Sequence, residues 1–246
     1  MDKYKKAADI IKRNKNIIVL TGAGISTESG IPDFRSANKG LWTKIDPMEA
    51  LSTKVLLEEP RKFYETGFKI ITAMRDAKPN KAHEILADME RNGVIQLIIT
   101  QNIDNLHFKA GSQNVYEVHG NSRNYTCMKC NKSYGITVIE EKIKMGEIPP
   151  KCSCRGVVRP DVVMFGDMLP NCFYKGMTEV QNADLLIAIG TSLTVYPVSQ
   201  LAEICKKLMI INLDSTAYDY RSEIVINDNI SEALTRIYSN LEIKDV

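Results

Sequence analysis

Short, mostly apolar runs alternate with helical patterns along most of the chain. These runs lack the apolar–polar alternation of a strand that has one solvent-exposed face. They are typical of parallel strands that are covered on both sides. The predicted strands are Ile17–Leu20, Gln96–Thr100, Val115–His119, Leu185–Ile189 and Leu208–Leu213.

The segments between these runs have one apolar face each. In residues 80–93, apolar side chains recur every three or four positions, as on an amphipathic helix. Further helices are predicted over the first residues, after Pro197 and over Ser231–Ser239. This alternation of strands and helices predicts an α/β fold with a doubly wound parallel sheet.

Two segments interrupt the alternation. Residues 36–76 have a mostly helical pattern, and residues 121–157 contain a group of cysteines. We therefore expect a large domain made of 1–35, 77–120 and 158–246. The helical module 36–76 and the zinc-binding module 121–157 would form a smaller, inserted lobe, and a cleft between lobes is a common ligand site.

Composition narrows the class of protein. The chain has 246 residues, 44% of them apolar, and a net charge of +2. That length supports a real core, and the near-neutral charge predicts neither a nucleic-acid partner nor an acidic membrane surface. No apolar run approaches the ~18 residues of a membrane span. The basic start of the chain has the spacing of a surface helix rather than of a targeting peptide, so we expect a cytoplasmic location.

Four of the six cysteines are clustered, at Cys127, Cys130, Cys152 and Cys154. In a reducing compartment such a cluster indicates a metal rather than disulfides. Four thiolates complete a tetrahedral shell, so the predicted ion is a structural zinc. The alternatives are reduced cysteines without metal, and a nucleic-acid-binding zinc ribbon, which the mixed lysines and glutamates of this segment disfavour.

In open α/β sheets, ligands bind where the strands end. The loop after the first strand contains Gly22, Ala23 and Gly24, which let backbone N–H groups approach a phosphate. Thr27 stands where the third glycine of a G-x-G-x-x-G loop would be. Loops after the later strands are also small or polar. They are Gln101–His107, His119–Asn121, Gly190–Leu193 and Asn212–Thr216. Gly190, Thr191 and Ser192 suit a phosphate or ribose, and Asn212 suits an adenosine hydroxyl.

His119 is the candidate general base. It ends a predicted strand, precedes Gly120 and faces the predicted crevice, and an imidazole titrates near neutral pH. Asn102, Asp104 and His107 allow a second interpretation as turn and capping residues, which we favour for His107. His83 lies within a predicted helix, and we expect it to be structural.

Several motifs occur in an order that resembles the sirtuins, the NAD-dependent protein-lysine deacylases. They are GAGIS, GIPDFR, TQNID followed by LH, HGN, the split cysteines, RPDVVMFGD, GTSL-x-V-x-P and the pair Ile211–Asn212. The resemblance covers nearly the whole chain. It implies a Rossmann-like large domain, NAD+ as co-substrate and a structural zinc. The reaction that it implies removes acetyl groups from protein or peptide lysines, and whether longer neutral acyl groups are also removed stays open. The substrate would be bound in an extended form, and the products would be nicotinamide and O-acyl-ADP-ribose.

The resemblance also implies roles for individual residues. His119 would be the base that deprotonates a ribose hydroxyl, with Asn102 as the second catalytic residue. The acyl-lysine peptide would contact Val162, Val163, Phe165, Gly166 and Val195. The implied cofactor positions are Gly22, Ala23, Gly24, Thr27, Asp33, Phe34, Arg35, Gln101, Asn102, Ile103, Asp104, His119, Gly190, Thr191, Ser192, Asn212, Leu213, Asp214, Asn229 and Ile230.

The sequence departs from the family pattern at a few positions. The second cysteine pair has the spacing C-x-C, Asp167 replaces the commoner Glu of FGE, and Phe108 replaces a polar residue. Tyr64 is present where sirtuins that prefer succinyl groups have a Tyr, but Gly67 stands where they have an Arg. Two other functions stay open from the sequence, transfer of ADP-ribose to a protein and non-catalytic NAD binding.

Overall fold

The computed structural model describes residues 2–33 and 46–243. Its large domain is built on a six-stranded, fully parallel sheet with the order β3-β2-β1-β7-β8-β9. Counted in chain order within this sheet, that is the 3-2-1-4-5-6 order of dinucleotide-binding folds. The strands are β1 (Ile17–Thr21), β2 (Leu97–Thr100), β3 (Val115–Glu117), β7 (Leu185–Ile189), β8 (Leu208–Ile211) and β9 (Ile224–Ile226).

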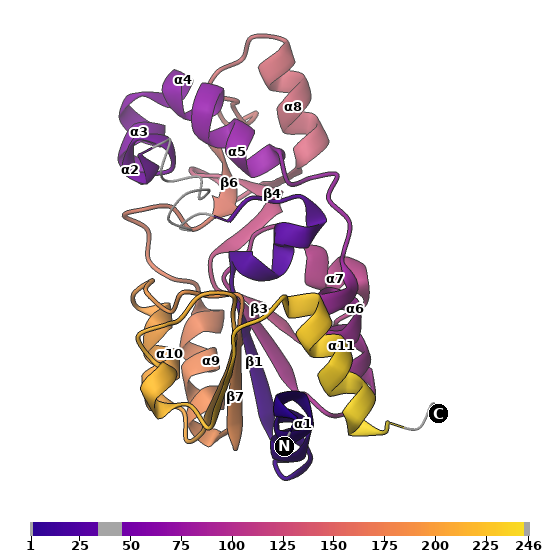
Figure 1. The fold of residues 1–246 in the computed structure, drawn as a ribbon. Coiled ribbons are helices and arrows are strands. Elements are labelled where there is room, and N and C mark those ends of the chain that lie inside the picture. The colour runs from indigo at the N-terminus through magenta and orange to yellow at the C-terminus, as the bar shows by residue number, and fades with distance from the viewer. Residues whose placement is uncertain (1, 34–45, 244–246) are drawn as a thin grey trace.

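Helices cover both faces of this sheet (Figure 1). One face packs against α1 (Lys3–Lys12), α6 (Lys81–Arg91) and α11 (Ile230–Leu241), whose apolar stripes merge into one core. The other face packs against α9 (Asn171–Asn182) and α10 (Leu201–Ile204) through a second core. Because both faces are covered, β1, β2, β7 and β8 are buried along their whole length, which explains their uninterrupted apolar runs.

The small domain combines a helical part and a sheet. The helical part contains α2 (Pro47–Ala50), α3 (Thr53–Glu58), α4 (Pro60–Lys62), the π-helical turn η3 (Phe63–Gly67) and α5 (Phe68–Thr72). The sheet is antiparallel, in the order β5-β4-β6. It consists of β4 (Gly120–Cys127), β5 (Ser133–Gly135) and β6 (Val158–Val162), and α8 (Ile136–Lys144) packs on it.

One continuous core joins the two parts of the small domain. Phe63 and Tyr64 of the helical part pack with Tyr125 and Ile139 of the zinc-binding part. The Tyr64 hydroxyl also donates a hydrogen bond of 2.6 Å to the carbonyl of Val158. The two chain excursions therefore form a single packed unit above the large sheet.

The fold class predicted from the sequence, a Rossmann-like doubly wound sheet with an inserted smaller lobe, is confirmed. The run Leu185–Ile189 is a strand with the predicted bounds. Two predicted strands are too long, because β3 ends at Glu117 and β8 at Ile211. The small sheet also contains β6, which pairs with β4 in antiparallel orientation.

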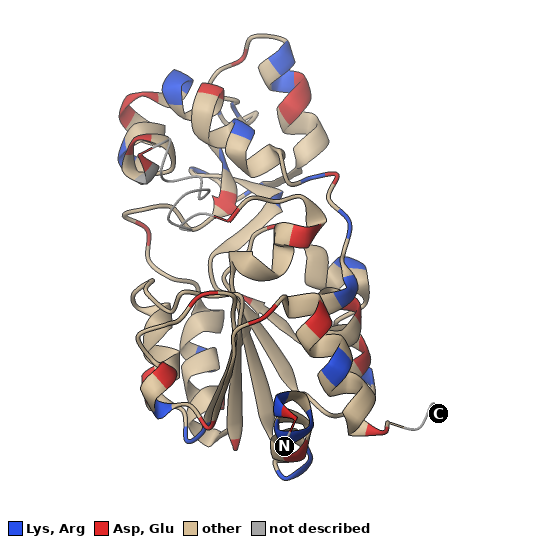
Figure 2. Ribbon diagram, in the orientation of Figure 1, with Lys and Arg blue, Asp and Glu red and all other residues tan. Residues whose placement is uncertain are grey.

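Figure 2 shows Lys and Arg interspersed with Asp and Glu along the helices that the structure describes. In the part of the chain that the structure describes, no helix has the length and apolar character needed to cross a bilayer.

Candidate active site

Two loops meet at the point where the strand order reverses, between β1 and β7. The Gly22 amide donates to the carbonyl of Ile189, and the Gly24 amide to the carbonyl of Gly190, at 3.1 and 2.9 Å. A Cβ at Gly24 would lie 2.8 Å from the Cα of Gly190. Gly190 itself has a φ of +61°, and a Cβ there would lie 2.4 Å from the amide nitrogen of Ile25. Glycine is therefore required on both loops for this contact.

A cavity of about 490 Å³ lies above this contact. It contains every sequence-predicted cofactor position except Ile103 and Asp104, which line a neighbouring cavity, and Phe34 and Arg35, which lie outside the described residues. Its lining includes Gly22, Ala23, Gly24, Thr27, Asp33, Gln101, Asn102, His119, Gly190, Thr191, Ser192, Asn212, Leu213, Asp214, Asn229 and Ile230. The loops after β1, β2, β3, β7 and β8 thus contribute to one space.

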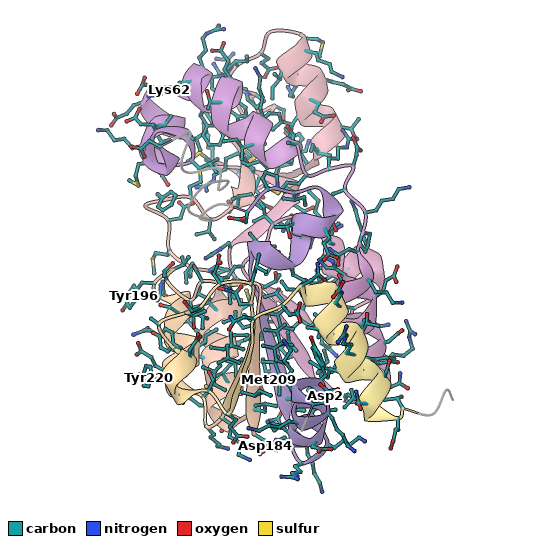
Figure 3. All side chains as sticks on the ribbon, in the orientation of Figure 1. Asp2, Lys62, Asp184, Tyr196, Met209 and Tyr220 are labelled. Atoms are coloured by element: carbon teal, nitrogen blue, oxygen red, sulfur yellow. The ribbon has the colours of Figure 1, made fainter. Side chains whose placement is uncertain are left out.

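The neighbouring cavity, of about 320 Å³, lies between the large and small domains. The predicted substrate residues Val162, Val163, Phe165, Gly166 and Val195 all line it. Figure 3 shows Tyr196 at the end of the large domain that faces the small domain, whereas Asp184 lies at the opposite end. This cavity therefore opens at the carboxyl edge of the sheet, beside the first one.

His119 lines both cavities, together with Ala23, Gln101, Asn102 and Val195. Its Nδ1 lies 2.9 Å from the carbonyl oxygen of Gln101. A carbonyl oxygen only accepts, so Nδ1 carries the proton and Nε2 is the basic nitrogen of the neutral ring. The half-buried ring is thereby held in one tautomer at the junction of the two cavities.

A buried hydrogen-bond network lies next to His119. The Asn102 amide nitrogen donates to the Gly22 carbonyl and to the Ser26 hydroxyl, both at 3.1 Å. The Ser26 hydroxyl donates to Asp104 at 2.7 Å, and the Leu106 amide donates to the same carboxylate at 2.9 Å. Burial raises the pKa of Asp104, and these two donors partly oppose the rise. The network gives Asn102 and Asp104 one orientation each.

Sequence reasoning missed several residues of the site. Ser26 belongs to the motif GAGIS, but only the folded structure brings its hydroxyl between Asn102 and Asp104. Ile31, Leu51 and Met74 line the second cavity and carry no local signal, because ordinary apolar residues of this kind also fill the core. Glu28, on the rim of the first cavity, accepts hydrogen bonds from Asn229 and Ser231 at the start of α11.

His83 and His107 lie away from both cavities. Both are almost fully buried, and their ring centroids are 5.0 Å apart. His107 Nε2 contacts the Thr21 hydroxyl at 3.0 Å, and His83 Nδ1 belongs to the capping box of α6 with Asn80. Burial lowers the pKa of His83 to about 4 and that of His107 to about 3. These contacts agree with the structural interpretation that we favoured for both residues.

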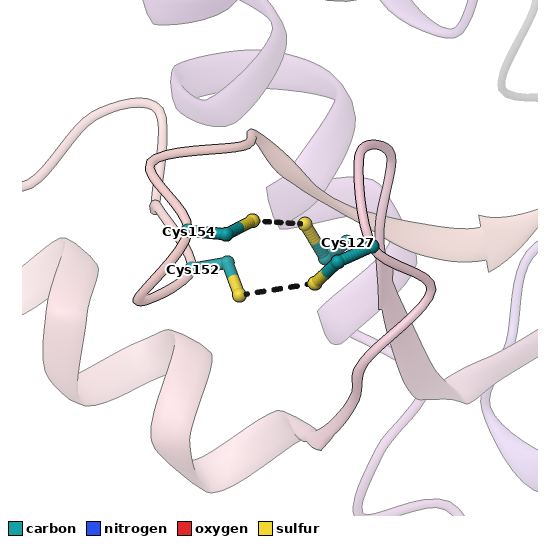
Figure 4. Close-up of side chains that lie close together, drawn as sticks. Cys127, Cys152 and Cys154 are labelled. Carbon is teal, nitrogen blue, oxygen red and sulfur yellow. Dashed lines mark hydrogen bonds between the residues drawn. The ribbon is translucent and has the colours of Figure 1, made fainter.

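The four clustered cysteines form a separate site in the small domain. Their sulfurs all lie within 4.8 Å of one another, and the pairs Cys127–Cys154 and Cys130–Cys152 are each 3.5 Å apart (Figure 4). Tetrahedral zinc with bonds of ~2.3 Å to sulfur needs separations of roughly 3.8 Å. A Cβ at Gly156 would lie 2.7 Å from the Cys127 sulfur. The set therefore fits zinc, and the short C-x-C spacing does not prevent it.

Comparison with known proteins gives consistent matches. The Sir2 family model matches residues 22–197. NAD-dependent protein deacetylase 2 of Caldanaerobacter subterraneus is 54% identical over 237 residues, which cover 96% of this chain and 95% of that protein. The NAD-dependent protein deacetylase of Sulfolobus acidocaldarius is 41% identical and covers 98% of this chain and 96% of its own length.

Solved structures match over almost the whole chain as well. A Sir2 variant with a deacetylated p53 peptide and 3'-O-acetyl-ADP-ribose has a TM-score of 0.93 at 36% identity, covering 99% of this chain and 100% of its own. A Sir2–p53 peptide–NAD+ structure has a TM-score of 0.89 at 35% identity, with the same coverage.

We predict one zinc per chain, held by the four clustered cysteines. Replacing Cys127 by Ser should release the metal and loosen the small domain, because a closed thiolate site contributes folding free energy. Elemental analysis and thermal melting measure both effects, and Cys205→Ser is the matched control that should keep the zinc. A folded, zinc-free wild-type preparation would contradict the prediction.

We also predict an acid-sensitive core. Both buried histidines have folded-state pKa values below the ordinary 6.5, so the unfolded chain binds more protons and stability falls as the pH drops below about 6.5. The loss should be about 2 kcal/mol per ring between pH 7 and 5. Urea unfolding across this range measures it. The double variant His83→Gln/His107→Gln should show a flatter pH dependence, and an unchanged slope would refute the assignment.

Proposed function

Because the chain belongs to the Sir2 family, we propose that it removes acetyl groups from protein lysines with NAD+ as co-substrate, releasing nicotinamide and O-acetyl-ADP-ribose. The observation that carries the proposal is the position of His119. It lies where a cavity of small, polar strand-end loops meets a largely apolar cavity between the domains. A reaction that joins a dinucleotide to an acylated side chain needs a base at such a junction.

The first cavity suits the dinucleotide. Its loops after β1 and β7 have glycines at positions 22, 24 and 190, which leave room for a phosphate beside the backbone. Asn212, Asp214 and Asn229 offer acceptors and donors to the adenosine end. NAD+, when bound, supplies a ribose carbon that becomes electrophilic as nicotinamide leaves.

His119 acts on the ribose next to this carbon. Gln101 holds the Nδ1 proton, so Nε2 takes the proton of a ribose hydroxyl, and that oxygen becomes a nucleophile. Charge develops on the imidazolium as this happens, and the Gln101 carbonyl stabilises it through the shared hydrogen bond. Asn102, held by Gly22 and Ser26, presents its amide to the same space. Asp104, buried against Ser26, offers an acceptor for the nicotinamide amide.

The second cavity suits the acyl-lysine. Val162, Val163 and Phe165 supply apolar walls. The peptide lies in an extended form between the segments 162–166 and 193–196, so its backbone is recognised more than its side chains. Closing such a cavity around the acyl group excludes water, which would otherwise hydrolyse the electrophilic ribose.

Zinc would be held by Cys127, Cys130, Cys152 and Cys154, and its contribution would be to the fold of the small domain rather than to the reaction. The protein works in the cytoplasm, a reducing compartment in which four cysteines stay available as thiolate ligands.

Mass spectrometry of an acetyl-lysine peptide incubated with NAD+ and the protein tests the function. The expected products are the free lysine peptide, nicotinamide and O-acetyl-ADP-ribose. Nicotinamide release that does not need the acetyl group, with ADP-ribose added to the peptide or protein, would instead identify an ADP-ribosyltransferase.

We predict that His119→Ala abolishes most deacetylation while NAD+ still binds. Loss of a general base typically costs ~100- to 10,000-fold in rate, whereas the loops that contact the dinucleotide stay in place. Turnover and NAD+ affinity are measured on the same preparation. The buried, non-lining His107 offers a contrast, since His107→Gln should lower stability without removing the base. Near-normal turnover of the His119 variant would overturn the assignment.

We predict that acetyl-lysine is a much better substrate than succinyl-lysine. Among the described residues that line the second cavity none is Lys or Arg, and two are Asp104 and Asp167. Gly67 has no space for a side chain, because a Cβ would lie 2.1 Å from the Ala50 carbonyl, and Arg61 is exposed and pairs with Glu65.

Among the described residues a succinyl carboxylate would therefore find no cation, and an uncompensated buried charge costs about 3–5 kcal/mol. The expected kcat/KM for succinyl-lysine is lower than for acetyl-lysine by roughly 100-fold or more. Butyryl-lysine, of similar length but neutral, is the control for size. A succinyl value at or above the acetyl value would contradict this prediction.

A further inference from the structure

Asp167 directly follows the segment Val162–Gly166, lines the second cavity with it and accepts several hydrogen bonds. Its Oδ1 accepts from Arg159 Nη1 at 3.1 Å and from the Thr53 hydroxyl at 3.0 Å. Its Oδ2 accepts from the Met164 amide at 2.9 Å and also contacts Arg159 Nη2. Both carboxylate oxygens are thus used twice, which is the geometry of a two-pronged Arg–carboxylate pair with added donors.

The partners of Asp167 come from different parts of the small domain. Arg159 belongs to β6, Met164 lies within the segment Val162–Gly166, and Thr53 begins α3 of the helical part. Arg159 Nη2 also donates to the Val162 carbonyl at 2.9 Å. The ion pair therefore holds both the start and the middle of the segment.

Backbone hydrogen bonds also join the segment Val162–Gly166 to the helical part. The Phe165 amide donates to the Leu51 carbonyl, and the Thr53 amide donates to the Phe165 carbonyl, each at 3.0 Å. Gly166 has a φ of +98°, a conformation that favours glycine, and it turns the chain back so that Asp167 reaches its partners. The segment is thereby attached to the helical part of the small domain.

The ion pair between Asp167 and Arg159 is mostly shielded from solvent. Only 20% of the Asp167 side chain and 18% of the Arg159 side chain are exposed. Burial acts against the charge of Asp167, but Arg159 and the Met164 amide outweigh it and keep the pKa of this carboxyl below its usual value. The carboxylate is therefore ionised at neutral pH, and solvent screens the pair less than it screens an exposed one.

We propose that Asp167 is a positioning residue that holds Val162–Gly166 in the conformation that binds the acyl-lysine peptide, by joining this segment to the helical part of the small domain. The inference rests on the proposed deacetylase function. Asp167 lines the second cavity but not the first. Its loss should therefore weaken peptide binding and leave NAD+ binding unchanged, which a general loss of structure would not do.

The experiment compares three variants with the wild type. Asp167→Asn removes the charge at constant size, Asp167→Glu keeps the charge on a side chain one methylene longer, and Thr53→Val removes only the bond to α3. Asp88→Asn is the control, since Asp88 forms an exposed ion pair with Arg91 on α6, outside both cavities. Binding of a short fluorescein-labelled acetyl-lysine peptide is measured by polarisation without NAD+, and NAD+ binding by calorimetry.

Asp167→Asn should weaken peptide binding by about tenfold or more, because the charged carboxylate that accepts from Arg159 and Met164 is lost. Asp167→Glu should recover part of this loss, and Thr53→Val should show a smaller loss in the same direction. NAD+ affinity and zinc content should match the wild type in all variants, and Asp88→Asn should change nothing.

Unchanged peptide affinity in Asp167→Asn would overturn the proposal, and so would an equal loss of NAD+ affinity. If Asp167→Asn does not fold, Thr53→Val decides, and wild-type peptide affinity in that variant would overturn the proposal. Because the binding measurement needs no turnover, a failure of the proposed function is separately visible, as a wild type that binds the peptide but releases no nicotinamide.

Discussion

The close contact between the loops after β1 and β7 is the constraint on which the site depends. Gly22, Gly24 and Gly190 let two backbones touch where the strand order reverses, and every one of these glycines lacks room for a Cβ. Any side chain there would push the strands apart or fill the space above them. The first cavity exists because this contact is made by backbone alone, and the Gly22 and Gly24 amides are used in the contact itself.

The second half of the site comes from the place where the chain leaves the large sheet. His119 and Gly120 lie at this crossing, and Gly120 has a φ of +74° with a hypothetical Cβ only 2.0 Å from the Asp161 carbonyl. The ring of His119 is held by the Gln101 carbonyl of the large domain, and the backbone carbonyl of His119 accepts from the Val163 amide of the small domain. The proposed base is therefore positioned by both domains, and it lies where they meet.

The large sheet and its loops could be predicted from the sequence because their signals are local. Buried parallel strands are uninterrupted apolar runs, and the glycines that follow them show where backbones must approach closely. The cysteine spacing likewise indicated the cluster that the structure brings together. The short, largely polar β5 and the three-residue β9 carry no comparable signal, and both were missed.

The rest of the site depends on contacts between distant segments. Ser26 reaches Asn102 and Asp104, and Met74 reaches the second cavity, only after the domains have packed. Asp167 departs from the family pattern in the sequence, but its partner Thr53 is 114 positions away along the chain. Such residues have ordinary local surroundings, so a pattern along the chain does not distinguish them from neighbours with purely structural roles.

The central claim is that the two cavities bring a dinucleotide and an acylated lysine together beside His119. A crystal structure of the His119→Ala variant with NAD+ and an acetyl-lysine peptide tests it most directly. The account predicts the acetyl oxygen within about 3–3.5 Å of the ribose carbon that bears nicotinamide, a distance suited to attack, next to the position of the missing ring. A structure in which protein separates the nicotinamide ribose from the acetyl group would contradict the account.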